Sequence, residues 1–176
     1  MKPFLVMSVA IGAVLAWPWN PAWGACMPAG NTADEKALLT ALEGAIEGYN
    51  QKNNGEINKH VTTDLHTKRT DNQATGDTKT EDTHSSDDYG QINVRDWKRF
   101  DGHKVSNCRV SNIKVAGATA GLDVQYDFTF TKDNKPPDGK HDGSTVPMKG
   151  KLKYKKVGNA WKISDIDVSN TNYPKK

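Results

Sequence analysis

The chain has 176 residues, of which 35% are hydrophobic and 26% are charged, and its formal net charge is +3. This length suits one domain with a single core and is too short for two well-packed cores. Nucleic-acid binding needs a clustered basic surface, and so mild an excess of basic residues does not predict one. We therefore expect no nucleic-acid partner.

The first 24 residues have the pattern of a secretory signal peptide. Lys2 gives a positive start, residues 5–16 form an uncharged apolar run, and the small residues Ala22, Gly24 and Ala25 offer a cleavage site. As a helix, that run spans about 18 Å, which is shorter than a bilayer core of roughly 30 Å. We expect cleavage after Gly24, or alternatively after Ala25, and no transmembrane segment in the mature chain. This predicts a protein that acts in the bacterial periplasm or outside the cell.

The chain has two cysteines, Cys26 and Cys108, and both remain after cleavage. In an oxidising compartment, such a pair most simply forms one disulfide. The bond would close a loop of about 80 residues, to which loop-entropy models assign about 4 kcal/mol of stabilisation. The alternative is a lipoprotein with lipid on Cys26, although Trp23 stands where a branched aliphatic residue is expected. The two hypotheses exclude each other, because a lipidated Cys26 leaves Cys108 as a free thiol.

Helices are expected first along the chain. Thr32 and Glu35 form a capping box, and an apolar face of helical spacing follows as far as Tyr49. Residues 53–55 end this helix. Residues 56–65 are expected to form a second, short helix.

Residues 66–88 are polar apart from Ala74, and we expect an exposed hairpin that turns at residues 75–77. Trp97 and Phe100 are expected to seal one end of the core. The strands that we expect after the polar segment, with a bulge in the second, cover residues 89–94, 105–115, 122–131, 146–154 and 160–168.

Helices followed by antiparallel strands predict an α+β fold, with the helices packed on one face of a curved sheet. We expect a single domain over residues 32–170, with short tails at residues 25–31 and 171–176. Even-numbered side chains between Leu122 and Tyr154 should face the interior, under the helix that begins near Thr32.

Two short signatures resemble a known superfamily. The first helix contains the run of residues 45–50, Ala-Ile-Glu-Gly-Tyr-Asn, and the last turn and the start of the last strand contain residues 158–163, Gly-Asn-Ala-Trp-Lys-Ile. With the order of the elements, they resemble the cystatin-like α+β roll of the nuclear transport factor 2-like (SnoaL-like) superfamily. The resemblance implies a cone-shaped sheet around the first helix, and a homodimer through its open face is one arrangement that it implies. The superfamily holds isomerases, dehydratases and epoxide hydrolases as well as non-catalytic binding and assembly domains, so fold alone does not choose a function.

Candidates for chemistry are few. Tyr49, Asp64 and Tyr126 could point into the cone, where a catalytic acid or base would lie, but each also has an ordinary structural explanation. We therefore assign no catalytic residue. We expect no cofactor, because the chain has no phosphate loop and no dinucleotide fingerprint.

Two charged groups have structural explanations. A lysine series on alternate positions, Lys149 to Lys155, is expected to face acidic residues of the neighbouring strand, with Asp127 opposite Lys149 and Asp123 opposite Lys153. The five histidines lack metal-ligand spacing. His84 lies near Asp82, Asp87 and Asp88, but this segment does not have the pattern of a calcium loop, and we expect no metal.

The function expected from the sequence is that of a non-catalytic exported binding or assembly domain, with an unknown protein partner or small-molecule ligand. A small-molecule isomerase or hydratase that uses the cone pocket is one alternative. A lipid-anchored envelope component is the other.

Overall fold

The computed structural model describes residues 26–72, 76–100, 102–131 and 145–170. The expected signal peptide (1–24) and C-terminal tail (171–176) lie outside these residues. No helix of the described residues is long and apolar enough to cross a membrane. The elements, in chain order, are α1 (Ala33–Asn50), α2 (Asn54–His60), β1 (Val61–Asn72), β2 (Thr78–Thr83), α3 (Ser86–Arg99), β3 (Gly102–Ala116), β4 (Thr119–Thr131), β5 (Thr145–Val157) and β6 (Ala160–Asn170).

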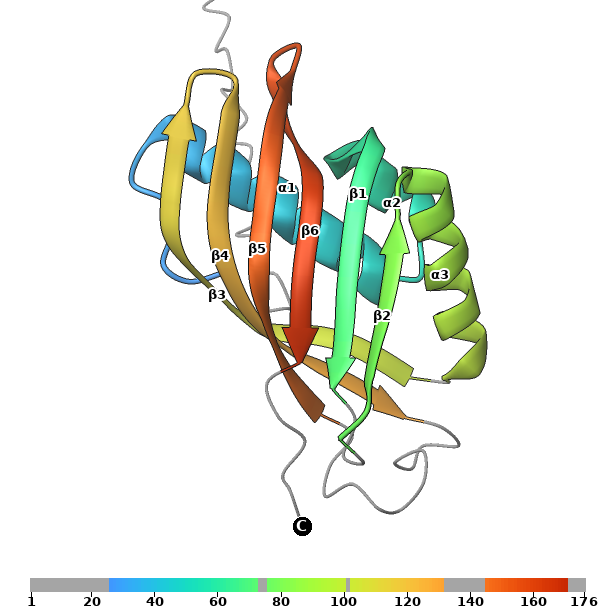
Figure 1. Cartoon of the computed structure of the whole chain (residues 1–176). Coiled ribbons are helices and arrows are strands. Elements are labelled where there is room, and N and C mark those ends of the chain that lie inside the picture. The colour runs from blue at the N-terminus through green and yellow to red at the C-terminus, as the bar shows by residue number, and fades with distance from the viewer. Residues whose placement is uncertain (1–25, 73–75, 101, 132–144, 171–176) are drawn as a thin grey trace, which may run out of the picture.

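The described strands form one six-stranded sheet in the order β2-β1-β6-β5-β4-β3. Neighbouring strands are antiparallel except β1 and β6, which are parallel, so the expected antiparallel sheet is in fact mixed. Figure 1 shows α1 crossing one face of the curved sheet and α3 lying beside β2. The predicted α+β fold is confirmed.

The helix α1 begins as expected. The Glu35 backbone N–H donates to Thr32 Oγ1, and the Glu35 carboxylate accepts from the Thr32 N–H, which completes the capping box. At its other end, the Asn50 amide donates to the Val105 carbonyl over 3.0 Å and accepts from the Val105 N–H over 2.7 Å. These two bonds fix α1 against the edge strand β3.

Two elements in the first half of the chain differ from expectation. The short helix α2 stops at His60, and Val61 and Leu65 belong to β1. The segment expected as a strand over residues 89–94 lies inside α3, whose N-cap Ser85 accepts from the Asp88 N–H. Acidic residues in the first turn and basic residues in the last turn favour this helix, as does its N-cap serine. These signals are stronger than the short apolar pattern from which the strand was predicted. The predicted hairpin between β1 and β2 is confirmed, although residues 73–75 of its turn lie outside the described residues. Its expected exposure is wrong in part, because the paired residues Thr67 and Thr83 are buried.

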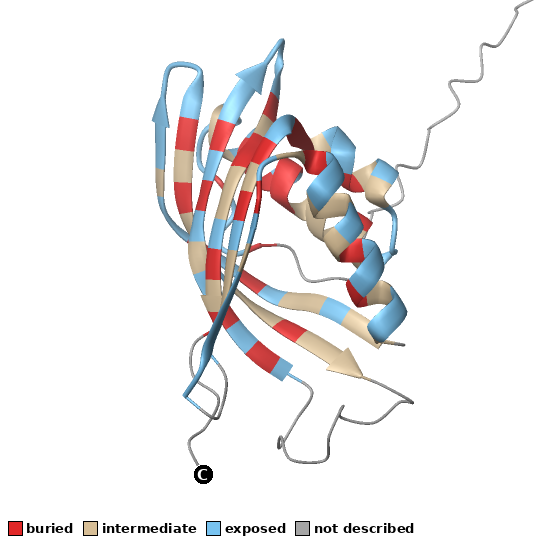
Figure 2. Ribbon diagram, turned by 45° about the vertical axis from the view of Figure 1, so that its right-hand side comes forward, coloured by how far each residue is buried: buried red, intermediate tan, exposed pale blue. Residues whose placement is uncertain are grey.

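Alternation along β4 and β5 places even-numbered side chains in the core, as predicted, and Figure 2 shows buried and exposed residues alternating along the strands. The predicted register was wrong by two residues. Asp127 lies opposite Pro147, Lys149 lies opposite Gln125, and Asp123 lies opposite Lys151. An even slip keeps every side chain on its face, so the alternation fixed the faces but could not fix the pairs.

The expected bulge in β3 is present and has a second one beside it. The β3–β4 register shifts after Ser106 and again after Ser111. Asn107 and Asn112 adopt positive φ at these shifts, and their amides donate to Asp127 and Asp123 over 2.7 and 2.6 Å. Bulges increase the local bend and twist of a strand, which curves this edge of the sheet around α1.

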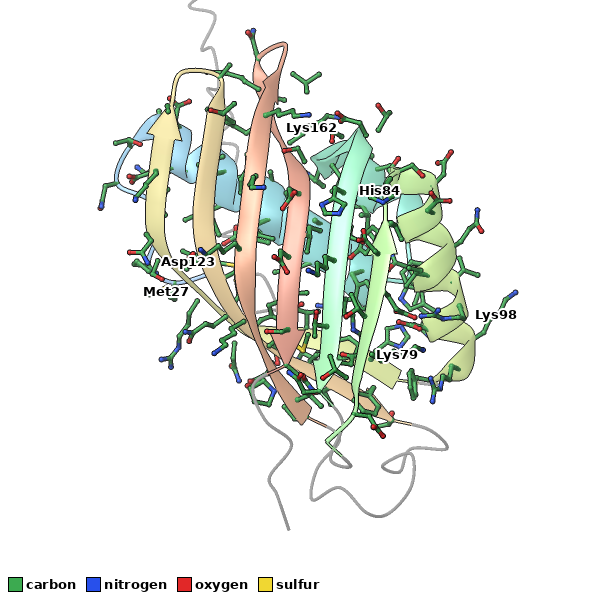
Figure 3. All side chains as sticks on the ribbon, viewed as in Figure 1. Met27, Lys79, His84, Lys98, Asp123 and Lys162 are labelled. Carbon is green, nitrogen blue, oxygen red and sulfur yellow. A yellow bond between two sulfur atoms is a disulfide. The ribbon has the colours of Figure 1, made fainter. Side chains whose placement is uncertain are left out.

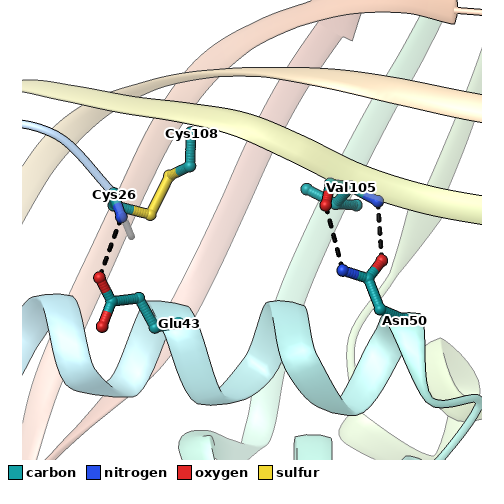
Figure 4. The surroundings of a disulfide bond; sticks show 5 residues. All are labelled: Cys26, Glu43, Asn50, Val105 and Cys108. Carbon is teal, nitrogen blue, oxygen red and sulfur yellow. Dashed lines mark hydrogen bonds between the residues drawn. A yellow bond between two sulfur atoms is a disulfide. The ribbon is translucent and has the colours of Figure 1, made fainter. Parts of the chain in front are cut away.

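The Cys26–Cys108 disulfide is present and buried (Figure 4). Met27 extends the attachment, because its N–H donates to the Cys108 carbonyl and its carbonyl accepts from the Val110 N–H. The Cys26 N–H donates to the Glu43 carboxylate over 2.9 Å. The N-terminal segment is thus bound to both β3 and α1, and the sulfur that a lipid anchor needs is bonded to Cys108.

Candidate functional site

A cavity of about 130 Å³ lies between the helices and the concave face of the sheet. Its lining comes from all three described helices and from all six described strands, with one residue each from β2 (Glu81) and β3 (Val105). Most of the lining is apolar, and includes Leu42, Ala45, Ile46, Val124, Met148 and Leu152. Polar side chains line the cavity at the side where α3 covers β1 and β2.

Tyrosines supply one set of polar groups. Tyr49 from α1, Tyr89 from α3 and Tyr126 from β4 all line the cavity. Burial raises the pKa of each phenol above its ordinary value of 10. The three hydroxyls therefore stay protonated at neutral pH and can donate hydrogen bonds but not act as bases.

A half-buried cation lies next to them. The Arg69 guanidinium contacts Asp71 at 3.2 Å and Asp96 at 3.3 Å, and it lies 5.4 Å from the centre of the Phe128 ring. Burial opposes its charge, but the two carboxylates outweigh this effect and raise its pKa above the ordinary value. Arg69 therefore stays charged at the wall of a mostly apolar cavity.

A second arginine extends the network. Arg95 Nη1 lies 2.7 Å from Glu81 Oε1, and Arg95 Nη2 lies 2.9 Å from Asp96 Oδ1. The Arg95 hydrogen bond lowers the pKa of Glu81. Among the described lining residues, the carboxylates are Glu81 and Asp96, and both are bound by arginines. Neither is positioned as an unengaged general base.

The three pocket residues proposed from the sequence separate in the structure. Tyr49 and Tyr126 line the cavity. Asp64 belongs to β1 and points to the outer face, where its side chain is 66% exposed and lies 2.8 Å from Lys155 Nζ. This lysine lowers the pKa of Asp64. Asp64 therefore has no part in the cavity.

An aromatic cluster lies behind Tyr49. Its ring lies 5.8 Å from that of Trp97 and 5.5 Å from that of His103, and the Trp97 and His103 rings are stacked. Among the described residues, Trp97 Nε1 and both ring nitrogens of His103 are buried without a hydrogen-bond partner. Burial lowers the pKa of His103, which is therefore neutral at pH 7. Trp97 packs against the core, as expected.

Sequence reasoning missed Arg69, Tyr89 and Asp96. Arg69 lies in the polar segment that was expected to be solvated, and the α3 segment was expected to start as a strand. A signal was present, because the α3 residues that line the cavity follow a helical spacing: Tyr89, Ile92, Asn93 and Asp96.

Comparisons with known proteins are informative for the fold. No protein-family model matches the chain, and no curated protein matches it in sequence. A candidate scytalone dehydratase from Novosphingobium aromaticivorans superposes with a TM-score of 0.59 at 14% identity, over 79% of this chain and 85% of that one. A cystatin-like domain of unknown function from Nostoc punctiforme gives 0.58 at 12% identity, over 82% of each chain. A ketosteroid isomerase-like protein from Erwinia carotovora gives 0.55 at 8% identity, over 78% of this chain and 95% of that one.

At such low sequence identities, the comparisons support the fold but do not assign an activity. The order of the elements, the curved mixed sheet and the helix across its concave face agree with the resemblance found in the sequence. The chain therefore has the cystatin-like α+β roll of the nuclear transport factor 2-like proteins.

Proposed function

We propose that the chain is an exported, non-catalytic binding protein whose ligand is a small, mostly apolar molecule with one polar group, held in the cavity. The size of the cavity supports a single-ring ligand. An apolar cavity of about 150 Å³ holds benzene, whereas sites for drug-sized ligands usually exceed about 300 Å³. Tyr49, Tyr89 and Tyr126 supply hydrogen-bond donors for the polar group.

The main support for binding without turnover is that the cavity carboxylates are paired with arginines. General base catalysis requires a group that can take a proton from the ligand. Asp96 contacts both Arg69 and Arg95, Glu81 contacts Arg95, and the lining phenols have raised pKa values. The carboxylates and phenols of the described lining are therefore engaged or protonated.

Export is part of the same proposal. Support comes from the signal-like pattern of residues 1–24 and from the buried disulfide, since disulfides persist in oxidising compartments. Intact mass of the exported chain separates this proposal from the lipid-anchored alternative. A processed chain that has lost the two hydrogens of its thiols supports export as a disulfide-bonded protein, and a diacyl adduct on Cys26 contradicts it.

The test uses the disulfide-bonded chain and three probes, benzene, phenol and cyclohexanol. We expect phenol to shift amide and side-chain NMR signals around Tyr49 and Tyr126 and to remain unchanged itself. Ala45→Phe should fill the cavity and abolish these shifts, whereas Ala37→Phe, at an exposed position of the same helix, should keep them. Failure of all three probes to bind at saturating concentration would contradict the proposal.

An isomerase or dehydratase is the second candidate. The observation that favours it is that a carboxylate, Asp96, lines the cavity. The fold is also similar to those of a candidate scytalone dehydratase and a ketosteroid isomerase-like protein. It predicts that the chain converts a single-ring hydroxyl or ketone substrate. It also predicts that Asp96→Asn abolishes this conversion while the chain stays folded.

A further inference from the structure

Two histidines and an aspartate meet on the outer face of the sheet, away from the cavity. His66 belongs to β1, Asp82 to β2, and His84 follows β2 directly. The β1–β2 register pairs Thr67 with Thr83, so its next position places His66 opposite His84. Figure 3 shows His84 beside β1, near the start of α3. The sequence spacing of 18 residues hides this neighbourhood, which only the hairpin creates.

The side chains converge on one point. His66 Nε2 lies 2.9 Å from Asp82 Oδ1, and His84 Nε2 lies 3.7 Å from the same oxygen. One ligand atom from each residue lies within 4.8 Å of the others, and the two rings are stacked with their centres 5.1 Å apart. Ligands of a tetrahedral Zn²⁺ ion at bond lengths of 2.0–2.1 Å lie about 3.3 Å from each other. The observed separations fall on both sides of this value.

A second carboxylate orients the central histidine. His66 Nδ1 lies 3.1 Å from Asp165 Oδ2 on β6, and Lys153 Nζ lies 3.3 Å from the same oxygen. Histidines that bind metal usually donate their other N–H to a carboxylate, which fixes the tautomer. Without an ion, His66 Nε2–H donates to Asp82 Oδ1, because a carboxylate oxygen only accepts. A bound metal would displace this proton while the Nδ1 proton stays directed at Asp165, and the Nε2 lone pair would then face the ion.

Ordinary hydrogen bonding explains only part of this arrangement. A His66 that bridges Asp82 and Asp165 accounts for two of the contacts. It does not account for His84, whose Nε2 lies 3.7 Å from the same Asp82 oxygen, which is beyond hydrogen-bond distance. A cation between the three ligand atoms accounts for all of them, and the Asp82 carboxylate offsets part of its charge, since Asp165 is already paired with Lys153.

We propose that His66, Asp82 and His84 form a binding site for a divalent transition-metal ion, with Zn²⁺ as the expected ion and Asp165 as the residue that positions His66. Two imidazoles and one carboxylate leave a fourth position for water. His84 and Asp82 are exposed, so the ion can enter from solvent. The site lies on the face opposite the cavity and is independent of the proposed ligand.

The experiment is titration calorimetry of the tag-free, disulfide-bonded chain with ZnCl₂. We expect one Zn²⁺ per chain, and His66→Ala and His84→Ala should each weaken binding by at least about 100-fold. Asp165→Asn should weaken it by about 10–100-fold, as expected for a group that orients a ligand. His60→Ala is the matched control, because His60 lies on α2 beside Glu56 and should leave the affinity unchanged.

A second measurement does not depend on how the variants fold. Addition of Zn²⁺ to the unmodified chain should shift the imidazole NMR signals of His66 and His84 and leave those of His60 and His103 in place. Absence of Zn²⁺ binding, or binding that survives both alanine variants in their folded form, overturns the proposal. Equal shifts at all the assigned histidines overturn it as well.

Discussion

The two faces of the sheet use the same kinds of charged residue in different surroundings. Over the inner face, Asp96 of α3 is 11% exposed and contacts Arg69 of β1, which is 31% exposed, at 3.3 Å. On the outer face, Lys155 is 52% exposed and contacts Asp64 at 2.8 Å. The shorter contact is thus the exposed one.

We expect burial, and not contact length, to rank these two pairs by energy. An exposed pair exchanges water contacts for protein contacts and is screened by salt, so its net contribution is small. A buried group that loses its partner stays uncompensated in a medium of low polarity, which is costly. The inner network should therefore be sensitive to single substitutions, and the outer pairs should tolerate them.

Asp96→Ala is expected to have the largest effect. It leaves Arg69 with Asp71 as its remaining carboxylate contact and weakens the attachment of α3 to β1. The free energy of unfolding, measured by urea titration, should fall by about 3 kcal/mol. Asp96→Asn keeps the shape of the side chain and removes its charge, so its free energy of unfolding should lie between those of the unmodified chain and of Asp96→Ala. A loss below about 1 kcal/mol for Asp96→Ala would show that the inner network is no more important than the outer pairs.

Gly150→Ala tests packing on the same two faces. An added Cβ at Gly150 would clash with the Asp167 carbonyl oxygen and lie 2.7 Å from Val168 Cα, so the backbone of β6 would have to move. We expect a loss of about 2 kcal/mol in urea titration. Gly121→Ala on β4 is the control, since its nearest contact would be an ordinary 3.5 Å. Equal losses for the two variants would contradict this distinction.

The sequence predicted the faces of the strands better than the contacts between them. Alternation placed Leu122 and Leu152 in the core correctly, because a side chain on the wrong face would lose its burial. The same alternation permits slips of two residues, so Asp127 was paired with Lys149 incorrectly.

The candidate site was harder to predict for a related reason. Tyr49 and Tyr126 were found because they lie in strongly periodic elements. Arg69 and Asp96 are 27 residues apart, and their contact depends on how α3 packs on β1, which no local pattern encodes. The His66–His84 pair likewise appears only when the hairpin register is known.

His103 allows the energetics of the buried side of the sheet to be tested through the pH dependence of stability. Burial lowers its pKa below the ordinary value of 6.5, and the charged or titratable groups that act on it are Tyr49, Lys52 and Asp96. The unfolded chain therefore takes up a proton that the folded chain resists, so His103 costs stability as the pH falls through about 6.5. His103→Phe keeps the ring contacts and removes two buried, unpartnered nitrogens. It should stabilise the protein by about 1 kcal/mol at pH 5 and by less at pH 7.5. An advantage that does not change with pH would contradict the assignment.

The smallest effect is expected for the outer pair of Lys155 and Asp64. Lys155→Ala, Asp64→Ala and the double variant form a cycle that isolates the coupling between the two side chains. Both residues are more than half exposed, so water and salt screen the contact on every side. The coupling should be close to the error of the urea titration in low salt and absent in 1 M NaCl. A coupling as large as the loss in Asp96→Ala would mean that contact length, and not burial, sets the energy of charged pairs in this sheet.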